Sequence, residues 1–265
     1  MALLQGNEGT RDVLRRLRAT GRGVLLLDFD GTLAPFTADP ASTRPYPGVP
    51  AALDALIQQG ATRIVVVTGR SVADGLPQLP TSLPLELWGG HGRERRLPDG
   101  TYRIQPLEET ALRALLAADE WAGEVEALGG RTERKPGSLA FHWRGLPEDQ
   151  VPAIRRLVLY RYASLPAYGG LRWLDFDGGI ELSAPGPSKA DAVTTLQAES
   201  GAEVPMAFLG DDRTDEDAFV AIRDRGLGIL VRREFRPTAA GAWLRPPAEL
   251  LDFLTGWYAS LEPAR

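Results

Sequence analysis

Two carboxylates in one short segment, Asp28 and Asp30, are the first residues of this sequence that could do chemistry. They directly follow an apolar run, 24–27, that has the length and composition of a buried strand. Side chains two residues apart on a strand point toward the same region, so both carboxylates can face one site. Such a pair can supply a nucleophile and a general acid/base. An ordinary Asp-Gly turn needs no function, and this segment alone leaves both interpretations open.

Two further segments offer groups that hold phosphate. Thr68, Gly69 and Arg70 bring a hydroxyl, backbone amides and a cation to the start of a predicted helix, which suits an anion. A plain helix cap explains the same residues without a ligand. Lys189 lies in the first turn of another predicted helix, where the helix dipole disfavours a cation. An anion bound beside Lys189 would remove that conflict, so this helix start favours a phosphate site.

A fourth segment indicates a metal site. Asp211 and Asp212 follow a predicted strand, and clustered carboxylates suit a hard cation such as Mg²⁺. The acids that come next, 215–217, fit the first turn of a helix, with Thr214 and Asp217 as a capping pair. We therefore expect metal chemistry at Asp211 and little from the later acids.

The alternation of strand and helix patterns places these four segments on one sheet. Strands are predicted at 24–29, 62–67, 85–88, 206–209 and 228–231, and helices at 50–59, 189–199, 215–225 and 248–260. This order indicates an α/β fold, a Rossmann-like parallel-sheet core with helices on both faces, whose ligands bind at the carboxyl edge of the sheet. All four segments fall at strand ends or helix starts on that edge. Together they supply what phosphoryl transfer through a covalent intermediate requires.

The middle of the chain breaks this alternation. The elements predicted there are a hairpin at 93–104, helices at 108–128 and 151–158, and hairpins at 131–144 and 171–183. We expect an inserted α+β cap domain of αββαββ order at 105–184, and a catalytic core made of 1–104 and 185–265.

The composition excludes several kinds of chemistry and partner. The 265 residues contain no cysteine, which rules out disulfides, zinc-thiolate sites and thiol nucleophiles. No apolar run approaches the ~20 residues that span a bilayer, and residues 1–11 do not resemble a secretory signal. We therefore expect a cytoplasmic protein with no membrane partner. The net charge of −5 argues against nucleic acid. Among 28 Arg there are two Lys, Lys135 and Lys189, which marks positions where a compact ammonium is needed.

The four segments resemble the motifs of the haloacid dehalogenase superfamily of phosphatases, in the same order and over the whole chain. Residues 28–32 resemble the first motif, Thr68 the second, Lys189 the third and 210–212 the fourth. Within that superfamily, the sequence is similar to trehalose-6-phosphate phosphatases at four places: 28–35, 68–70, Gly90-His91-Gly92 and 210–217.

The resemblance implies a role for each motif residue. Asp28 would attack phosphorus, and Asp30 would protonate the leaving sugar oxygen before it activates water. Mg²⁺ would be held by Asp28, the backbone carbonyl of Asp30, and Asp211, with Asp212 beside them. The phosphoryl group and its surroundings would be bound by a set of neighbouring residues: Gly31, Thr32, Thr68, Gly69, Arg70, His91 and Lys189.

The resemblance places sugar recognition in the cap domain, on four charged residues: Glu133, Lys135, Arg144 and Glu181. Solvent-exposed cross-strand pairs are the ordinary alternative, but the rarity of lysine favours a functional role for Lys135. The family usually has a basic or amide side chain shortly before the position of Glu181, whereas this chain has Asp-Gly-Gly-Ile at 177–180. That departure weakens the assignment of trehalose and leaves the core chemistry unaffected.

The expected activity is Mg²⁺-dependent hydrolysis of a small-molecule sugar phosphate such as trehalose 6-phosphate, with a trehalose-phosphate synthase as a candidate pathway partner. One alternative is another sugar-phosphate or glycosyl-phosphoglycerate phosphatase with the same core. Another is a regulatory domain that binds metal and phosphate without hydrolysis, against which the proton donor Asp30 argues. Dinucleotide binding at 89–92 is disfavoured because the Gly-x-Gly-x-x-Gly spacing is absent.

Overall fold

The computed structural model describes residues 8–37, 40–75, 79, 81, 84–165, 170–176 and 178–262. The chain forms two compact units, one made of Met1–Arg103 with Pro187–Arg265 and the other of Ile104–Gly186. The inserted unit starts one residue before and ends two residues after the expected cap, 105–184. Within the described residues, every helix is too short or too polar to span a bilayer.

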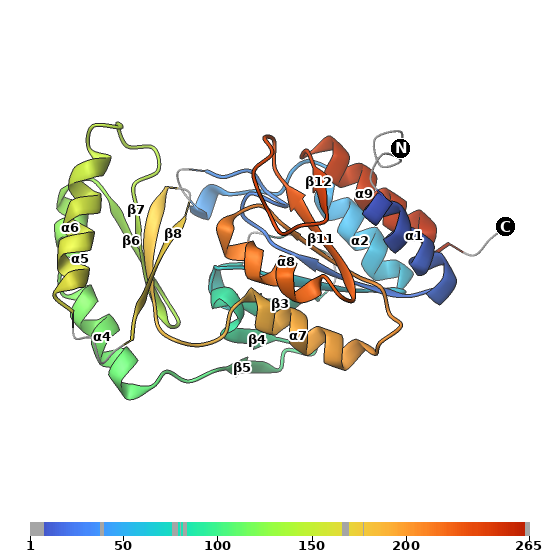
Figure 1. Cartoon of the computed structure of the whole chain (residues 1–265), viewed down its shortest axis with the longest axis horizontal. Helices are drawn as coiled ribbons and strands as arrows, with labels where there is room; N and C mark the ends of the chain where they lie inside the picture. The colour runs from blue at the N-terminus through green and yellow to red at the C-terminus, as the bar shows by residue number, and fades with distance from the viewer. Residues whose placement is uncertain are drawn as a thin grey trace. The chain divides into compact units, whose positions relative to one another are not determined.

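The first unit is built on an eight-stranded sheet (Figure 1). Its strands lie in the order β12 (Ala242–Leu244), β11 (Gly226–Val231), β10 (Met206–Gly210), β1 (Gly23–Leu27), β2 (Thr62–Val67), β3 (Glu86–Gly89), β4 (Glu94–Arg96) and β5 (Tyr102–Ile104). The strands from β12 to β3 are parallel, and β4 joins β3 in the antiparallel direction. The carboxyl ends of β1, β2 and β10 therefore meet at one edge, as the sequence predicts.

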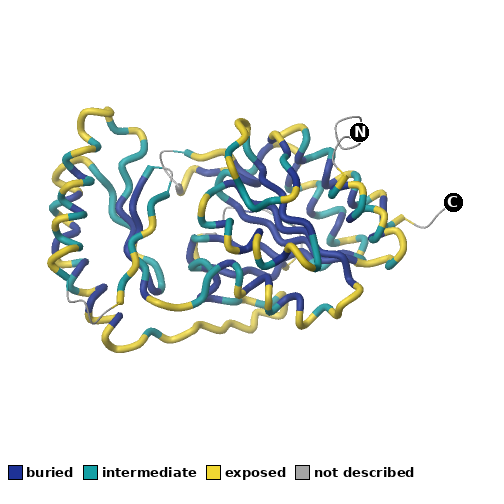
Figure 2. The backbone as a smooth tube through the Cα atoms, in the orientation of Figure 1, coloured by how far each residue is buried: buried dark blue, intermediate teal, exposed yellow. Residues whose placement is uncertain are grey.

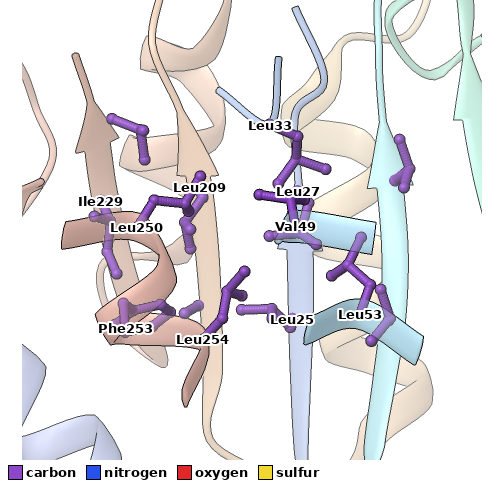
Figure 3. Close-up of a cluster of buried hydrophobic side chains, with 14 of the residues drawn as sticks. Leu25, Leu27, Leu33, Val49, Leu53, Leu209, Ile229, Leu250, Phe253 and Leu254 are labelled. Carbon is purple, nitrogen blue, oxygen red and sulfur yellow. The ribbon is translucent and has the colours of Figure 1, made fainter. Parts of the chain in front are cut away.

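Helices cover both faces of this sheet because its central strands are apolar on both sides (Figure 2). Leu25 and Leu27 pack on one face, against α2 (Val49–Gln59) and α9 (Ala248–Ser260) (Figure 3). The same cluster includes buried residues of α1 (Glu8–Thr20). Val24 and Leu26 pack on the other face, against α7 (Lys189–Ser200) and α8 (Glu216–Ile222). Each fully buried leucine contributes about 1.5–3 kcal/mol, so β1 is anchored from both sides.

Several elements of this unit were not predicted. Helix α1 has a largely polar sequence. The three-residue strand β12 is too short to show the alternation of apolar and polar residues that predicts a strand. The predicted helix 215–225 is a 3₁₀ turn, η6 (Arg213–Asp215), followed by the shorter α8. Three short elements complete the unit: η2 (Pro40–Ser42), α3 (Val72–Gly75) and η4 (Gly90–Gly92).

The inserted unit is an antiparallel sheet with helices on one face. The sheet order is β6 (Arg131–Lys135), β7 (Ser138–His142), β9 (Gly179–Ser183) and β8 (Arg172–Phe176). Alternate residues of β7 and β9, including Phe141 and Ile180, form an apolar core with α4 (Glu109–Asp119), α5 (Ala122–Ala127) and α6 (Val151–Ala163). The other face of the sheet therefore carries the polar residues of the same strands.

The single helix predicted at 108–128 is two helices, α4 and α5. The chain departs from helical geometry at Trp121, where φ is −105° and ψ is 7°. Trp121 is buried and stacks on Phe141, with ring centroids 4.9 Å apart. Packing of this large ring against the sheet outweighs the continuity of the helical pattern.

Candidate active site

Asp28 lies directly after β1, at the carboxyl edge of the parallel sheet, and is 4% exposed. Its backbone N–H continues the ladder by donating to the carbonyl of Leu209 on β10. Because β1 and β10 are parallel neighbours, Asp211 follows β10 at the same level, and the two carboxylates face each other. The Thr32 hydroxyl lies 3.1 Å from Asp28 Oδ2 and 3.4 Å from Asp211 Oδ1, so it connects them.

Gly31 leaves the room that Asp211 occupies. Its φ is +91°, and a Cβ built there would lie 2.2 Å from Asp211 Oδ2. A side chain at residue 31 would displace the Asp211 carboxylate. Both the left-handed backbone and the close approach therefore require glycine at this position.

Lys189 begins α7 and joins two buried carboxylates. Its Nζ lies 2.6 Å from Asp28 Oδ1 and 2.6 Å from Asp215 Oδ1. Ser188 caps the helix, in a capping box with Asp191. The conflict between a lysine and the helix dipole is thus relieved by the protein's own carboxylates. Burial lowers the pKa of Lys189, but Asp215 and Asp28 outweigh this effect and raise it, so Lys189 is protonated.

The sequence pattern predicts little chemistry at Asp215, but the structure places it in the acidic cluster with Asp28 and Asp211. It is fully buried, and its Oδ2 accepts hydrogen bonds of 3.0 Å from the backbone N–H groups of Asp211 and Asp212. The capping box of η6 is formed by Asp212 and Asp215, so the predicted capping pair of Thr214 and Asp217 is wrong. The spacing from Asp212 to Asp215 is itself a capping-box spacing and could have identified Asp215.

Asp28, Asp211 and Asp215 form a compact acidic cluster. Each offers one carboxylate oxygen, and these oxygens lie within 4.8 Å of one another. Burial raises the pKa of Asp28 to about 7 against the opposing charge of Lys189. Burial, Asp28 and Asp215 together raise the pKa of Asp211. Three carboxylates beside one ammonium favour a cation, and buried oxygen ligands are those that Mg²⁺ prefers, so the residues fit a magnesium ion.

Asp30 occupies a more open position than Asp28, with 29% of its side chain exposed. Arg70 donates two hydrogen bonds to the Asp30 carboxylate, from Nε to Oδ2 at 2.7 Å and from Nη2 to Oδ1 at 2.6 Å. The guanidinium lies over the ring of Phe29, 5.3 Å from its centroid. The two carboxylates of the first motif therefore have different environments, as distinct chemical roles require.

The loop after β2 is braced by the turn η4. Thr68 is buried, and its hydroxyl accepts a hydrogen bond from the backbone N–H of Arg70. The backbone N–H of His91 donates to the carbonyl of Thr68, and φ of His91 is 57°, in the left-handed region. A Cβ on Gly69 would lie 2.6 Å from the His91 ring, so glycine lets the imidazole pack against this loop.

Three of the four predicted cap residues, Glu133, Lys135 and Glu181, lie on the polar face of the inserted sheet. Glu133 and Glu181 are both register partners of Ala140, one from each side. Lys135 Nζ lies 2.9 Å from Glu181 Oε2, and the two side chains are 9% and 4% exposed. His142 Nε2 lies 2.8 Å from Glu133 Oε2. These pairs are not the solvent-exposed cross-strand pairs of the alternative interpretation.

Arg144 lies beyond the end of β7, near the turn that contains Gly178. A Cβ on Gly178 would lie 2.8 Å from Arg144 Nε, so the arginine packs closely over this turn. The backbone N–H of Trp143 donates to the carbonyl of Gly178 in the same region. Asp177, part of the departure noted in the sequence, lies outside the described residues.

The fold and the site define a haloacid dehalogenase-like core interrupted by an α+β insertion. The structure matches BT1666 from Bacteroides thetaiotaomicron, described as a phosphatase of the haloalkanoate (HAD) superfamily, with a TM-score of 0.56, 18% identity, and coverage of 89% of this chain and 95% of that chain. It also matches the C-terminal domain of trehalose-6-phosphate phosphatase from C. albicans, with a TM-score of 0.75, 21% identity, and coverage of 96% and 97%. At these identities the likeness shows the fold.

The sequence model of the trehalose-phosphatase family matches residues 26–243, and the chain belongs to that family. A curated relative, the trehalose-phosphate phosphatase of Mycobacterium marinum, is 32% identical over 90% of this chain. The chain spans 62% of the length of that relative.

Proposed function

We propose that this chain is a magnesium-dependent phosphomonoesterase that hydrolyses trehalose 6-phosphate to trehalose and phosphate through an aspartyl-phosphate on Asp28. Membership in the trehalose-phosphatase family supports the substrate. The observation that carries the proposal is the buried contact of Asp28 with Lys189, inside a cluster with Asp211 and Asp215.

The chemistry follows from the two environments of the first motif. A carboxylate oxygen of Asp28 attacks phosphorus, a new bond forms between them, and the bond from phosphorus to the sugar oxygen breaks. Asp30 gives its proton to that leaving oxygen. Asp30 then takes a proton from water, which attacks phosphorus and releases phosphate from Asp28. For this role Asp30 must exchange its ion pair with Arg70 for contacts to the substrate.

Phosphate binding is assigned to the residues around Asp28. Lys189, Thr32 and Thr68 bring an ammonium and two hydroxyls to the same edge of the sheet. Gly31, Gly69, Arg70 and His91 complete the set of proposed binding residues. A fixed cation and preorganised donors stabilise the charge that develops on a transferring phosphoryl group.

Magnesium would be held by Asp28, Asp211 and the backbone carbonyl of Asp30, with Asp212 and Asp215 beside them. The ion would neutralise the excess negative charge of this cluster and of the phosphoryl oxygens. Since Asp215 is engaged by Lys189 and by two backbone N–H groups, we assign it to holding the site in shape.

The inserted unit is proposed to act as the cap domain that selects the sugar. Glu133, Lys135, Arg144 and Glu181 would bind hydroxyl groups, because ionised groups make strong hydrogen bonds to neutral partners. The Asp-Gly-Gly-Ile sequence at 177–180 favours a second candidate, another sugar phosphate acted on by the same core. The cytoplasm as location and a trehalose-phosphate synthase as the source of substrate complete this proposal.

The test is phosphate release from a panel of trehalose 6-phosphate, glucose 6-phosphate, sucrose 6-phosphate, mannosylglycerate phosphate and an aryl phosphate, with Mg²⁺ and with a chelator. We expect Mg²⁺-dependent release with a preference for trehalose 6-phosphate. A Mg²⁺-dependent preference for another member would overturn the substrate and keep the mechanism. No release from any member would overturn the proposed activity.

A further inference from the structure

Arg236, in the segment after β11, reaches the loop that carries Asp211 and Asp212. Its Nη2 donates to the backbone carbonyls of Asp212 at 2.7 Å and Asp211 at 3.2 Å, and its Nε lies 3.3 Å from the Asp211 carbonyl. Its Nη1 forms an ion pair with the carboxylate of Glu216. The side chain is 19% exposed, so these contacts are largely shielded from water.

Arg236 and Asp215 hold the same peptide plane from opposite edges. The carbonyl of Asp211 and the N–H of Asp212 belong to one peptide group, and in a trans peptide these two bonds point in opposite directions. Arg236 donates to that carbonyl, while Asp215 Oδ2 accepts from that N–H at 3.0 Å. Loss of the guanidinium would free the peptide to rotate, and Asp215 would lose one of the donors that orient it.

The orientation of Asp215 matters for the nucleophile. Its second oxygen, Oδ1, accepts from Lys189, and the same ammonium donates to Asp28. A continuous series of direct hydrogen bonds thus leads from Arg236, through one peptide plane, Asp215 and Lys189, to Asp28. Such a series can transmit a shift in position because each step is a direct hydrogen bond that is partly or fully buried, although the contacts of Arg236 to the Asp211 carbonyl, at 3.2 and 3.3 Å, are the longest.

We propose that Arg236 is a positioning residue of this site: it fixes the peptide between Asp211 and Asp212, and through it Asp215, Lys189 and Asp28. The inference rests on the proposed function for its catalytic consequence. Arg236 touches none of the reacting groups, and it acts through the backbone. Glu216 fixes the guanidinium in turn, and its other oxygen accepts from the backbone N–H of Ala239 at 2.7 Å, which ties the 236–239 segment to the start of α8.

The role demands the planar guanidinium. Nε and Nη2 together reach two successive carbonyls, while Nη1 faces Glu216. A lysine ammonium keeps the charge, but it cannot direct donors to the two carbonyls and to Glu216 at the same time. Charge alone would therefore not restore the site.

The test compares Arg236→Ala and Arg236→Lys with Arg223→Ala, a control in which an exposed arginine just after α8 is removed. We expect kcat on the preferred sugar phosphate to fall about tenfold to a hundredfold in both Arg236 variants, since small misplacements of reacting groups have effects of this size. The KM should change little, because the variants leave the proposed sugar-binding residues intact. The control should keep wild-type kcat.

Two measurements separate positioning from simple destabilisation. Added guanidinium chloride at low concentration should partly restore kcat of Arg236→Ala, whereas a merely less stable protein would lose activity further. Binding of Mn²⁺, followed by its electron paramagnetic resonance signal without substrate, should be about tenfold weaker in both Arg236 variants and unchanged in the control.

Wild-type kcat and Mn²⁺ affinity in Arg236→Ala would overturn the inference, and so would an activity loss that guanidinium deepens. If the wild type releases no phosphate from any substrate, the proposed function fails, and the Mn²⁺ titration alone decides whether Arg236 positions the acidic loop.

Discussion

The two lysines of this chain form largely buried ion pairs in two different units, and the charges around the two pairs differ. Lys189 lies at the edge of a parallel sheet, 2.6 Å from both Asp28 and Asp215. Lys135 lies on an antiparallel sheet, 2.9 Å from Glu181. With 28 arginines in the same chain, the use of lysine at both places indicates that a compact point charge is needed there.

The balance of charge differs between the two pairs. In the first unit, the Lys189 ammonium pairs with Asp28 and Asp215, and Asp211 adds a third carboxylate to the same cluster. In the inserted unit, Glu133 and Glu181 lie on the face that also carries Lys135 and Arg131.

The excess of negative charge in the first unit, more than the lysine itself, distinguishes the two sites. Three buried carboxylates beside one ammonium repel one another, and a divalent cation bound among them would relieve that repulsion. A face whose charges nearly cancel attracts no ion strongly, but it offers charged hydrogen-bond donors and acceptors to a neutral ligand. This is the property that binding of sugar hydroxyls needs.

The largest expected effect is that of Asp28→Asn in the core. This substitution preserves shape and removes the nucleophilic oxygen, so we expect turnover of every phosphate ester to fall by roughly four orders of magnitude or more. Folding should be retained, because the loss of one acid from the cluster relieves repulsion. Steady-state phosphate release and a thermal melt measure the two effects. Substantial residual turnover would contradict the covalent mechanism.

Asp215→Asn should have the next largest effect, and Asp217→Asn is its matched control. Asp215 is fully buried and paired with Lys189, so its neutralisation disturbs both the ammonium and the acidic loop. We expect about a hundredfold loss of kcat. Asp217 is exposed in the first turn of α8, so Asp217→Asn should leave kcat within a few-fold of wild type. Equal losses in the two variants would contradict the distinction between them.

Asp215 and Asp217 also show which kind of site residue a sequence pattern cannot identify. Asp28, Lys189 and Asp211 follow apolar runs or open a helix, so local pattern and parallel-sheet topology were enough to bring them together. Asp215 stands in a run of acids at a helix start, where an ordinary cap explains it equally well. Only the three-dimensional contact with Lys189, 26 residues earlier in the chain, separates it from Asp217.

The elements that were missed share another cause. The strand β12 gains its stability from the sheet beside it, and the break between α4 and α5 depends on the stacking of Trp121 on Phe141. Neither leaves a periodic signal, because both are decided by contacts between distant segments. The sequence does not predict the contacts of Arg236 for the same reason, because its partners include backbone carbonyls, which every residue possesses.

Lys135→Met tests the balanced site in the inserted unit. It keeps much of the side-chain volume and removes the charge that pairs with Glu181. We expect KM for the preferred sugar phosphate to rise about tenfold, while kcat/KM for an aryl phosphate stays near the wild-type value. Equal losses on both substrates would show that the pair supports the fold more than the sugar.

The smallest expected effect is the dependence of stability on the Glu133–His142 contact. Burial raises the pKa of Glu133, but the hydrogen bond from His142 and the charge of Lys135 outweigh it and lower the pKa from 4.5 to about 2. A carboxyl whose pKa is depressed in the folded state stabilises that state at pH above its unfolded value, and the contribution is lost as pH falls through the folded value. We therefore expect Glu133→Gln to lower the free energy of unfolding by about 1 kcal/mol at pH above 4.5. The difference from wild type should shrink as pH falls toward about 2, in urea titrations at each pH. A difference independent of pH would mean that packing at this position, and not the charge of Glu133, stabilises the inserted sheet.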